Sequence, residues 1–117
     1  MRTHKDLTVW QKSMELVELI YKTTNKLPKS ELFGLISQMQ RSAISIPSNI
    51  AEGAKREHKN EYIQFLSIAN GSASELETQL LLTKKLYPKL KTEIEKALPL
   101  LDEILRMLYS FMKSLRN

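Results

Sequence analysis

The sequence contains no cysteine, only three glycines and four prolines, and no long run of apolar residues. The lack of cysteine excludes disulfide bonds and thiolate metal sites, and it fits a reducing compartment. No apolar run approaches the roughly 18 residues needed to span a bilayer. The first residues, MRTHKDLTVWQ, lack the apolar core of a signal peptide. We therefore expect a soluble, cytoplasmic protein that makes no membrane contact.

Histidine is also scarce, which removes most catalytic arrangements. The two histidines, His4 and His58, fall near the N-terminus and in a predicted turn, so neither can activate a serine within a helix. There is no Glu-x-x-His pair of the kind that binds di-iron centres in helical bundles. There is also no glycine-rich phosphate loop. We expect no enzymatic activity, no metal, no cofactor and no small-molecule substrate.

Leucine, isoleucine, methionine, lysine and glutamate dominate what is present, which is typical of an all-α protein. Apolar residues recur at helical spacing in four stretches, separated by the dipeptides Leu27–Pro28 and Tyr87–Pro88 and by a polar turn. Thr8 and Thr92 have the spacing of capping boxes with Gln11 and Glu95. The pattern predicts a single domain, 1–117, folded as an antiparallel up-down-up-down four-helix bundle. The expected helices cover about 8–26, 30–55, 60–86 and 92–115.

The stretch 32–54 carries only two formal charges, Arg41 and Glu52, although exposed helices normally show a charged face. One seam, at spacings of three and four residues, is apolar and consists of Leu32, Ile36, Met39, Ala43, Ile46 and Ile50. A second stripe is mostly small and polar and consists of Gln38, Arg41, Ser45, Ser48 and Glu52. We interpret the stretch as a helix contacted on two sides, once by its own domain and once by another surface. The alternative is a solvated face with few charges.

Proline 47 interrupts this helix, because it cannot donate a hydrogen bond to the carbonyl of Ala43. Either one helix is kinked near Pro47 or two helices meet near Ser45. The apolar seam keeps its phase across Pro47, which favours one kinked helix. The freed carbonyl would then need another donor, and serine hydroxyls are close in sequence.

A hairpin turn near His58 also predicts which residues face each other. Arg41 is expected to be buried and therefore paired, with Glu75 as its partner and with Gln38 and Ser45 one turn away. Along the next helix, a stripe of small residues around Gly71 would let another backbone approach closely, since a mid-helix glycine is otherwise unfavourable. The stripe consists of Ser67, Gly71, Ser74 and Thr78. The register places Arg41 opposite Glu75, Asn49 opposite Ser67 and Pro47 opposite Ala69.

Basic residues gather at the predicted turns of a chain whose net charge is +5. One cluster, at the second turn, consists of Lys55, Arg56, His58 and Lys59. A second group, at the opposite end of the bundle, consists of Lys22, Lys26, Lys29, Lys84, Lys85, Lys89 and Lys91. Several adjacent cations favour phosphate binding that depends on salt, although turns are often simply solvated. Among the aromatic residues, only Tyr87 is near a basic cluster in the sequence, so we expect electrostatic binding with little sequence specificity.

The segments QMQRSAISIPSNIAEG and IANGSASELETQLL, with the opening DLTVWQKSMELVELIY and the turn LPKSELFGL, resemble the 23S ribosomal-RNA intervening-sequence family. The resemblance covers Asp6 to about Leu115. It implies a four-helix bundle that assembles into a ring-like homopentamer and associates with RNA or a nucleoprotein. Where the family has a serine before the third helix, this chain has His58, three residues ahead of Glu61, and Asn60 is a competing cap. We expect an oligomeric RNA-binding module; the alternative is a protein–protein adaptor that binds no nucleic acid.

Overall fold

The computed structural model describes residues 3–117 and contains four long α-helices. These are α1 (Thr8–Thr24), α2 (Ser37–Ala54), α3 (Lys59–Leu86) and α4 (Lys91–Arg116). Short 3-10 turns precede α1, follow Pro28 and follow Tyr87, and a wider π-type turn, Leu32–Ile36, leads into α2. No strand occurs among the described residues. The prediction of an all-α fold is confirmed.

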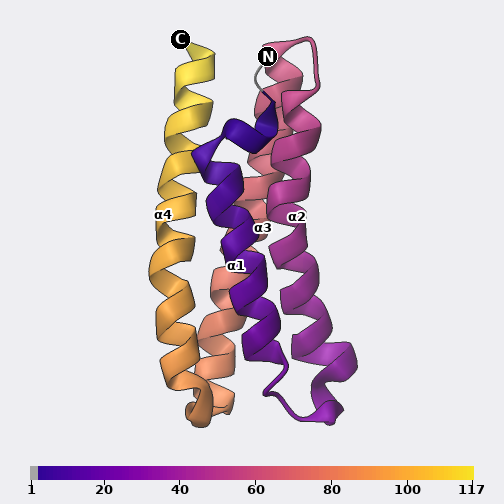
Figure 1. Cartoon of the computed structure of the whole chain (residues 1–117), viewed down its shortest axis with the longest axis vertical. Helices are drawn as coiled ribbons and strands as arrows, with labels where there is room; N and C mark the ends of the chain where they lie inside the picture. The colour runs from indigo at the N-terminus through magenta and orange to yellow at the C-terminus, as the bar shows by residue number, and fades with distance from the viewer. Residues whose placement is uncertain (1–2) are drawn as a thin grey trace.

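The helices are antiparallel to their neighbours in the chain, and Figure 1 shows the chain running down, up, down and up through the bundle. Each helix packs mainly against two others, so that α1 contacts α2 and α4, and α3 also contacts α2 and α4. The molecule measures 44 × 23 × 22 Å. At a rise of about 1.5 Å per residue, α3 alone spans nearly this length. The connections α1–α2 and α3–α4 therefore share one end of the bundle, and α2–α3 lies at the other (Figure 1).

The core forms along the seams that the spacing predicts. On α1, Val9, Ser13, Leu16 and Ile20, which recur at spacings of three and four residues, are all buried, and so is Leu27 just beyond the helix. On α2, the four seam residues from Met39 to Ile50 are fully buried. The remaining core side chains come from α3, α4 and the turn between them: Leu66, Ala69, Ala73, Leu76, Leu80, Leu90, Ile94, Ala97, Leu101, Ile104, Leu108 and Met112. Helical periodicity therefore locates the buried face of α1 and that of α2 from Met39 onward.

The helix starts differ in detail from the predicted caps. Helix α1 begins at Thr8, but its cap is Leu7, and the Gln11 side chain donates to the carbonyl of Lys5 at 2.8 Å. Helix α4 is capped by Leu90, so Thr92 lies within the first turn. Both predicted capping boxes are wrong because a short 3-10 turn precedes each helix and moves its cap to an apolar residue.

Helix α3 begins directly after His58, which is its cap with extended backbone angles. The position at which the family carries a serine is thus the true cap position, and Asn60 lies inside the helix. In the described chain the His58 side chain makes no capping hydrogen bond. The first turn instead contains Glu61, whose charge is favourable near a helix N-terminus.

Helix α2 runs without interruption from Ser37 to Ala54 across Pro47, so the preference for one helix over two is confirmed. A bend at Pro47 stays a prediction. The irregular backbone lies earlier, at Gly34, where φ and ψ are both −113°. This break shifts the phase of the apolar seam, and Leu32 is consequently 52 % exposed instead of buried.

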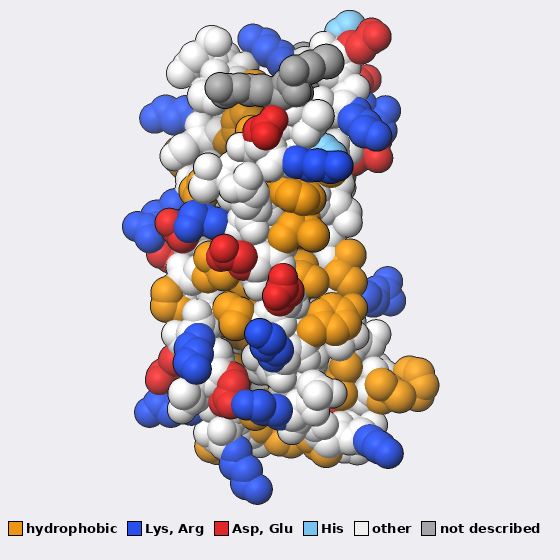
Figure 2. Space-filling model, viewed as in Figure 1, with side chains coloured by type: hydrophobic (Ala, Val, Ile, Leu, Met, Phe, Trp, Pro, Cys, Tyr) orange, Lys and Arg blue, Asp and Glu red, His pale blue; other side chains and the backbone are white. Residues whose placement is uncertain are grey.

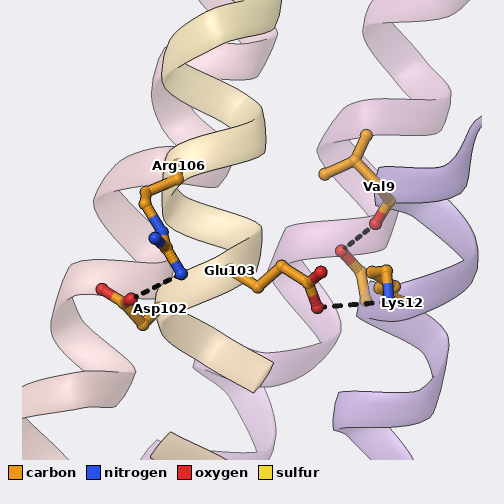
Figure 3. A network of polar contacts seen from close by, with 6 residues as sticks. Val9, Lys12, Asp102, Glu103 and Arg106 are labelled. Atoms are coloured by element: carbon orange, nitrogen blue, oxygen red, sulfur yellow. Dashed lines mark hydrogen bonds and ion pairs between the residues drawn. The ribbon is translucent and has the colours of Figure 1, made fainter. Parts of the chain in front are cut away.

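Polar contacts between α1 and α4 lie on the side of the bundle away from the α2–α3 pair. Lys12 of α1 contacts Glu103 of α4 at 3.1 Å, and Arg106 contacts Asp102 within α4 at 3.1 Å (Figure 3). These groups are exposed or half-buried, so each pair contributes little to stability. Within residues 3–117, no helix is long and apolar enough to cross a membrane.

Candidate nucleic-acid interface and assembly face

Two connections meet at one end of the bundle, and Glu31 joins them. Its carboxylate accepts a hydrogen bond from the backbone N–H of Leu35 at 3.3 Å, which caps the irregular turn before α2. The other carboxylate oxygen accepts a hydrogen bond from the Tyr87 hydroxyl at 2.5 Å. This bond, followed by burial and the nearby Glu31 charge, raises the pKa of Tyr87 above its ordinary value. One carboxylate therefore fixes the α1–α2 turn against the α3–α4 turn.

We define the basic end as the seven lysines around these two connections: Lys22, Lys26, Lys29, Lys84, Lys85, Lys89 and Lys91. Several blue side chains are visible at the lower end of the face that Figure 2 shows. Two of these lysines are already paired: Lys84 contacts Glu95 at 3.2 Å, and Lys26 contacts Glu93 at 2.5 Å. The hydrogen bond from Lys26 is the main reason that the pKa of Glu93 is lowered. These two lysines are therefore largely neutralised by protein carboxylates.

The other lysines of the basic end are exposed and free of such partners. In the part of the chain that the structure describes, no carboxylate lies within 4.0 Å of their ammonium groups. They come from the ends of α1 and α3, the start of α4 and both connections: Lys22, Lys29, Lys85, Lys89 and Lys91. Of the predicted trio of Lys84, Lys85 and Lys89, the last two are thus available to a ligand, whereas Lys84 is half-buried in an ion pair.

The predicted cluster at the opposite end is partly used within the protein. Arg56 contacts Glu52 at 2.6 Å and lies 4.8 Å from the centre of the Phe65 ring, which is a cation–π arrangement. Lys55 and Lys59 are exposed, and neither pairs with a carboxylate among residues 3–117. At this end Lys55 and Lys59 are therefore available to a ligand, whereas Arg56 contacts Glu52 of α2 and Phe65 of α3.

The pairing of α2 with α3 follows the predicted register. The Ser72 hydroxyl lies 2.8 Å from the Ser45 hydroxyl, one residue from the expected alignment. The Asn49 amide donates to the Ser45 hydroxyl at 2.9 Å and to the Ser45 carbonyl at 2.7 Å. Ser72 is buried, and its bond to Ser45 connects the two helices, whereas the Asn49 bonds lie within α2. Among the described residues no serine hydroxyl donates to the Ala43 carbonyl, so the expected serine donor is not observed, and the Asn49 amide donates to the Ser45 carbonyl instead.

Arg41 and Glu75 line the same shallow groove between α2 and α3, but the predicted burial and ion pair are wrong within the chain. Both residues are exposed, and their charged groups are not within 4.0 Å of each other. The reason is that a stripe with few charges can still face solvent when it lies beside the helix contact. The groove has a volume of about 370 Å³ and is lined by Gln38, Arg41, Ser42, Ser45, Ser72, Glu75 and Gln79.

Two further features mark this side of α2 and α3, which we call the assembly face. The Gln79 side-chain oxygen is buried beside the groove, yet it has no hydrogen-bond partner among the described residues. The small-residue stripe is exposed, and a Cβ built at Gly71 would meet nothing within 4 Å. No other helix of the described chain therefore packs closely against Gly71, and the expectation that the stripe lets α2 approach α3 is wrong. Three exposed apolar side chains of α3, Ile68, Leu82 and Leu86, lie seven residues from Glu75 or Gln79 and therefore on the same side of the helix.

Gly53 is the glycine at which the two helices come closest. A Cβ there would lie 2.9 Å from the Cβ of Phe65 and 2.9 Å from Cδ1 of Tyr62, closer than packed carbon atoms approach. Its position in the quoted SNIAEG segment is thus explained by packing. The sequence does not reveal this role, because the periodicity of one helix does not show which residue of the other helix lies opposite it. Only the packed structure places Gly53 against Tyr62 and Phe65.

Exposed aromatic rings at the basic end were also missed by sequence reasoning. Phe33, in the irregular turn, is 92 % exposed, and Tyr21, near the end of α1, is 42 % exposed. Spacing alone puts Tyr21 at the margin of the buried seam of α1, next to Ile20, and Phe33 is off the apolar seam of residues 32–54. The local signal was the sequence Phe33–Gly34 after Pro28, where glycine permits an irregular turn that turns the ring outward.

Comparison with protein families gives one match for most of the chain. The model of the family described as 23S rRNA-intervening sequence protein matches residues 5–110. This range includes all of α1, α2 and α3 and most of α4. The search of curated proteins found no match.

Proposed function

The chain belongs to the 23S rRNA-intervening sequence protein family, and from that premise we propose that it is a non-enzymatic, oligomeric module that binds RNA through its basic end. The description of the family names ribosomal RNA, which makes RNA the acidic partner to consider first. The observation that carries the proposal is the group of five exposed lysines that have no carboxylate partner among residues 3–117. Two connections, far apart in the sequence, bring these cations together.

Such a surface can bind phosphates through several weak contacts at once. Each lysine that neutralises a phosphate releases condensed counterions, so the observed affinity falls as the salt concentration rises. Neither Lys85 nor Lys89 has to break an ion pair within the described chain before it binds. Both therefore contribute directly, whereas Lys84 would first have to leave Glu95.

Assembly would multiply these contacts. A ring-like homopentamer, which the family resemblance implies, would present several basic ends to one RNA and raise the overall affinity without new contacts. The assembly face supports self-association because it combines exposed apolar side chains of α3 with a groove beside which the Gln79 oxygen has no partner in the described chain. An interface residue of a second copy would supply the missing hydrogen bond.

The test is an RNA-binding titration at several salt concentrations with a structured RNA. We expect the double variant Lys85→Gln/Lys89→Gln to reduce the slope of log affinity against log salt by about two. The matched control is Lys55→Gln/Lys59→Gln, which removes the same charge at the opposite end. If only the control changes the slope, the second turn is the interface. If wild-type protein shows no salt-dependent binding, the chain is better explained as a protein–protein adaptor.

A further inference from the structure

The basic end contains an apolar pocket that takes no part in the proposed contacts between lysines and phosphates. It lies between the end of α1 and the turn that leads into α2, and its volume is about 670 Å³. Leu27, Leu32 and Ile36 supply an apolar lining, and the Tyr21 ring forms part of the wall. This volume falls in the range of pockets that hold small molecules or single nucleotides.

Charged and polar groups surround this apolar lining. Lys22 and Lys29 both line the pocket and are exposed, and within the described part of the chain no acidic residue lines it. The side-chain amides of Asn25 and Gln40 also line it, and the Gln40 amide donates to the Thr24 hydroxyl at 3.1 Å. The pocket therefore combines a flat ring, an apolar lining, amide donors and acceptors, and two cations.

Phe33 adds a second exposed ring on the turn that forms the pocket. It directly follows Leu32, a lining residue, and the carboxylate of Glu31 caps this turn. Exposed aromatic rings among cations are the arrangement with which proteins bind unpaired nucleic acid, because each base can stack on a ring while its phosphates meet positive charge. A base inside a duplex is already stacked and cannot enter such a pocket.

We propose that this pocket takes an unpaired nucleobase of RNA, which stacks on Tyr21 while the flanking phosphates bind Lys22 and Lys29. The inference rests on the proposed RNA-binding function and narrows it to RNA with unpaired bases. The charge of the lining is complementary to this ligand, and the pocket is continuous with the basic end through Lys22 and Lys29. The amides of Asn25 and Gln40 are placed to bond to the edge of the base.

The test compares two RNAs of equal length, one a hairpin with 2-aminopurine in its loop and the other a blunt duplex. Wild-type protein should bind the hairpin more tightly and change the 2-aminopurine fluorescence. Tyr21→Ala should weaken hairpin binding by roughly 5- to 150-fold, the range expected from loss of one stacked base. Its salt slope and its duplex affinity should stay unchanged. Tyr21→Phe keeps the ring and should bind like wild type.

Tyr109→Ala is the matched control, because Tyr109 is an exposed ring on α4, 62 % accessible and outside the pocket lining. If hairpin and duplex bind equally and Tyr21→Ala has no effect, the pocket proposal falls while electrostatic RNA binding stands. If neither RNA binds, both proposals fail. If a peptide rich in Leu and Glu binds in a Tyr21-dependent way and the hairpin does not, the pocket is a peptide groove. Crosslinking of a 4-thiouridine loop to the unmodified protein should map to Tyr21 or Phe33, and mapping to another surface overturns the proposal.

Discussion

Two glycines in helices, Gly53 and Gly71, have opposite surroundings although each lies within regular helical backbone. Gly53 of α2 faces the first turns of α3 so closely that an added Cβ would meet Tyr62 and Phe65 at 2.9 Å. Gly71 of α3 faces open space. The structural role of a helical glycine therefore depends on which side chains of the neighbouring helix lie opposite it.

We predict that Gly53→Ala destabilises the protein by about 1–3 kcal/mol, the usual range for overpacking a tight contact. The Cβ of Phe65 is tied to the backbone of α3 and cannot move aside without shifting the helix. Gly71→Ala is the control, and it should raise the stability of the folded chain by about 0.5–1 kcal/mol, because alanine is the better helix former. Urea unfolding at one protein concentration measures both. Equal effects of the two substitutions would contradict this account of Gly53.

Residue-level prediction from the sequence succeeded where periodicity decides and failed where a neighbour decides. The buried seams of α1 and α2 followed from spacing, because burial of apolar surface sets the orientation of each helix. Arg41 was misplaced because its stripe has few charges, yet the stripe lies beside the contact with α3 and not within it. The exposed rings of Tyr21 and Phe33 depend on the irregular backbone before α2, which no hydrophobic period encodes.

At the scale of elements, the start of α2 and the α3–α4 connection form one unit through Glu31 and Tyr87. The four helices could be located from the sequence, since long apolar periods and prolines mark them. The irregular turn at Leu32–Ile36 could not, because it depends on one carboxylate that accepts bonds from two directions. The predicted helix therefore began near Ser30, whereas regular α2 begins at Ser37.

This unit predicts a loss of stability at alkaline pH. The folded state raises the pKa of Tyr87, first through the hydrogen bond to Glu31, so it holds the hydroxyl proton more tightly than the unfolded state does. The stability that this bond contributes is complete below the ordinary tyrosine pKa of about 10 and is lost as the pH rises through the raised value. Thermal unfolding between about pH 8 and 11 measures this loss.

Tyr87→Phe should unfold at a lower temperature near neutral pH, because the bond to Glu31 is gone, and should lose less stability at alkaline pH. Some alkaline loss should remain, since burial also raises the pKa of Tyr62. Tyr109→Phe, on α4, is the control and should keep the wild-type alkaline loss. An unchanged alkaline loss in Tyr87→Phe would show that the Glu31 contact does not link the two connections.

For the whole molecule, the bundle separates two kinds of surface. The basic end is formed by the connections, which are short because adjacent helices are antiparallel, whereas the assembly face runs along α2 and α3. An RNA bound at the end would leave the long face free for other copies of the chain. A heterologous contact through such a face closes a ring when the rotation between copies permits it.

Arg41 is the residue that tests this arrangement. It is exposed within the chain and lines the groove that also contains Glu75 and the unpartnered oxygen of Gln79. Because Arg41 has no ion pair within the described chain, Arg41→Ala should change the stability of the single chain by no more than about 0.5 kcal/mol. In an oligomer the same change removes a charged group from the interface, so we expect dissociation to smaller species.

Light scattering at micromolar concentration, with circular dichroism to confirm the helices, separates the two effects. Arg106→Ala is the matched control, since Arg106 is an exposed arginine of α4 whose partner Asp102 is on the same helix. Dissociation of Arg41→Ala with intact helices, and an unchanged mass for Arg106→Ala, would place the contact at the assembly face. If Arg41→Ala keeps the wild-type mass, the contact lies elsewhere. If wild-type protein is itself a 13.6 kDa monomer, the groove and the exposed residues of α3 serve another partner.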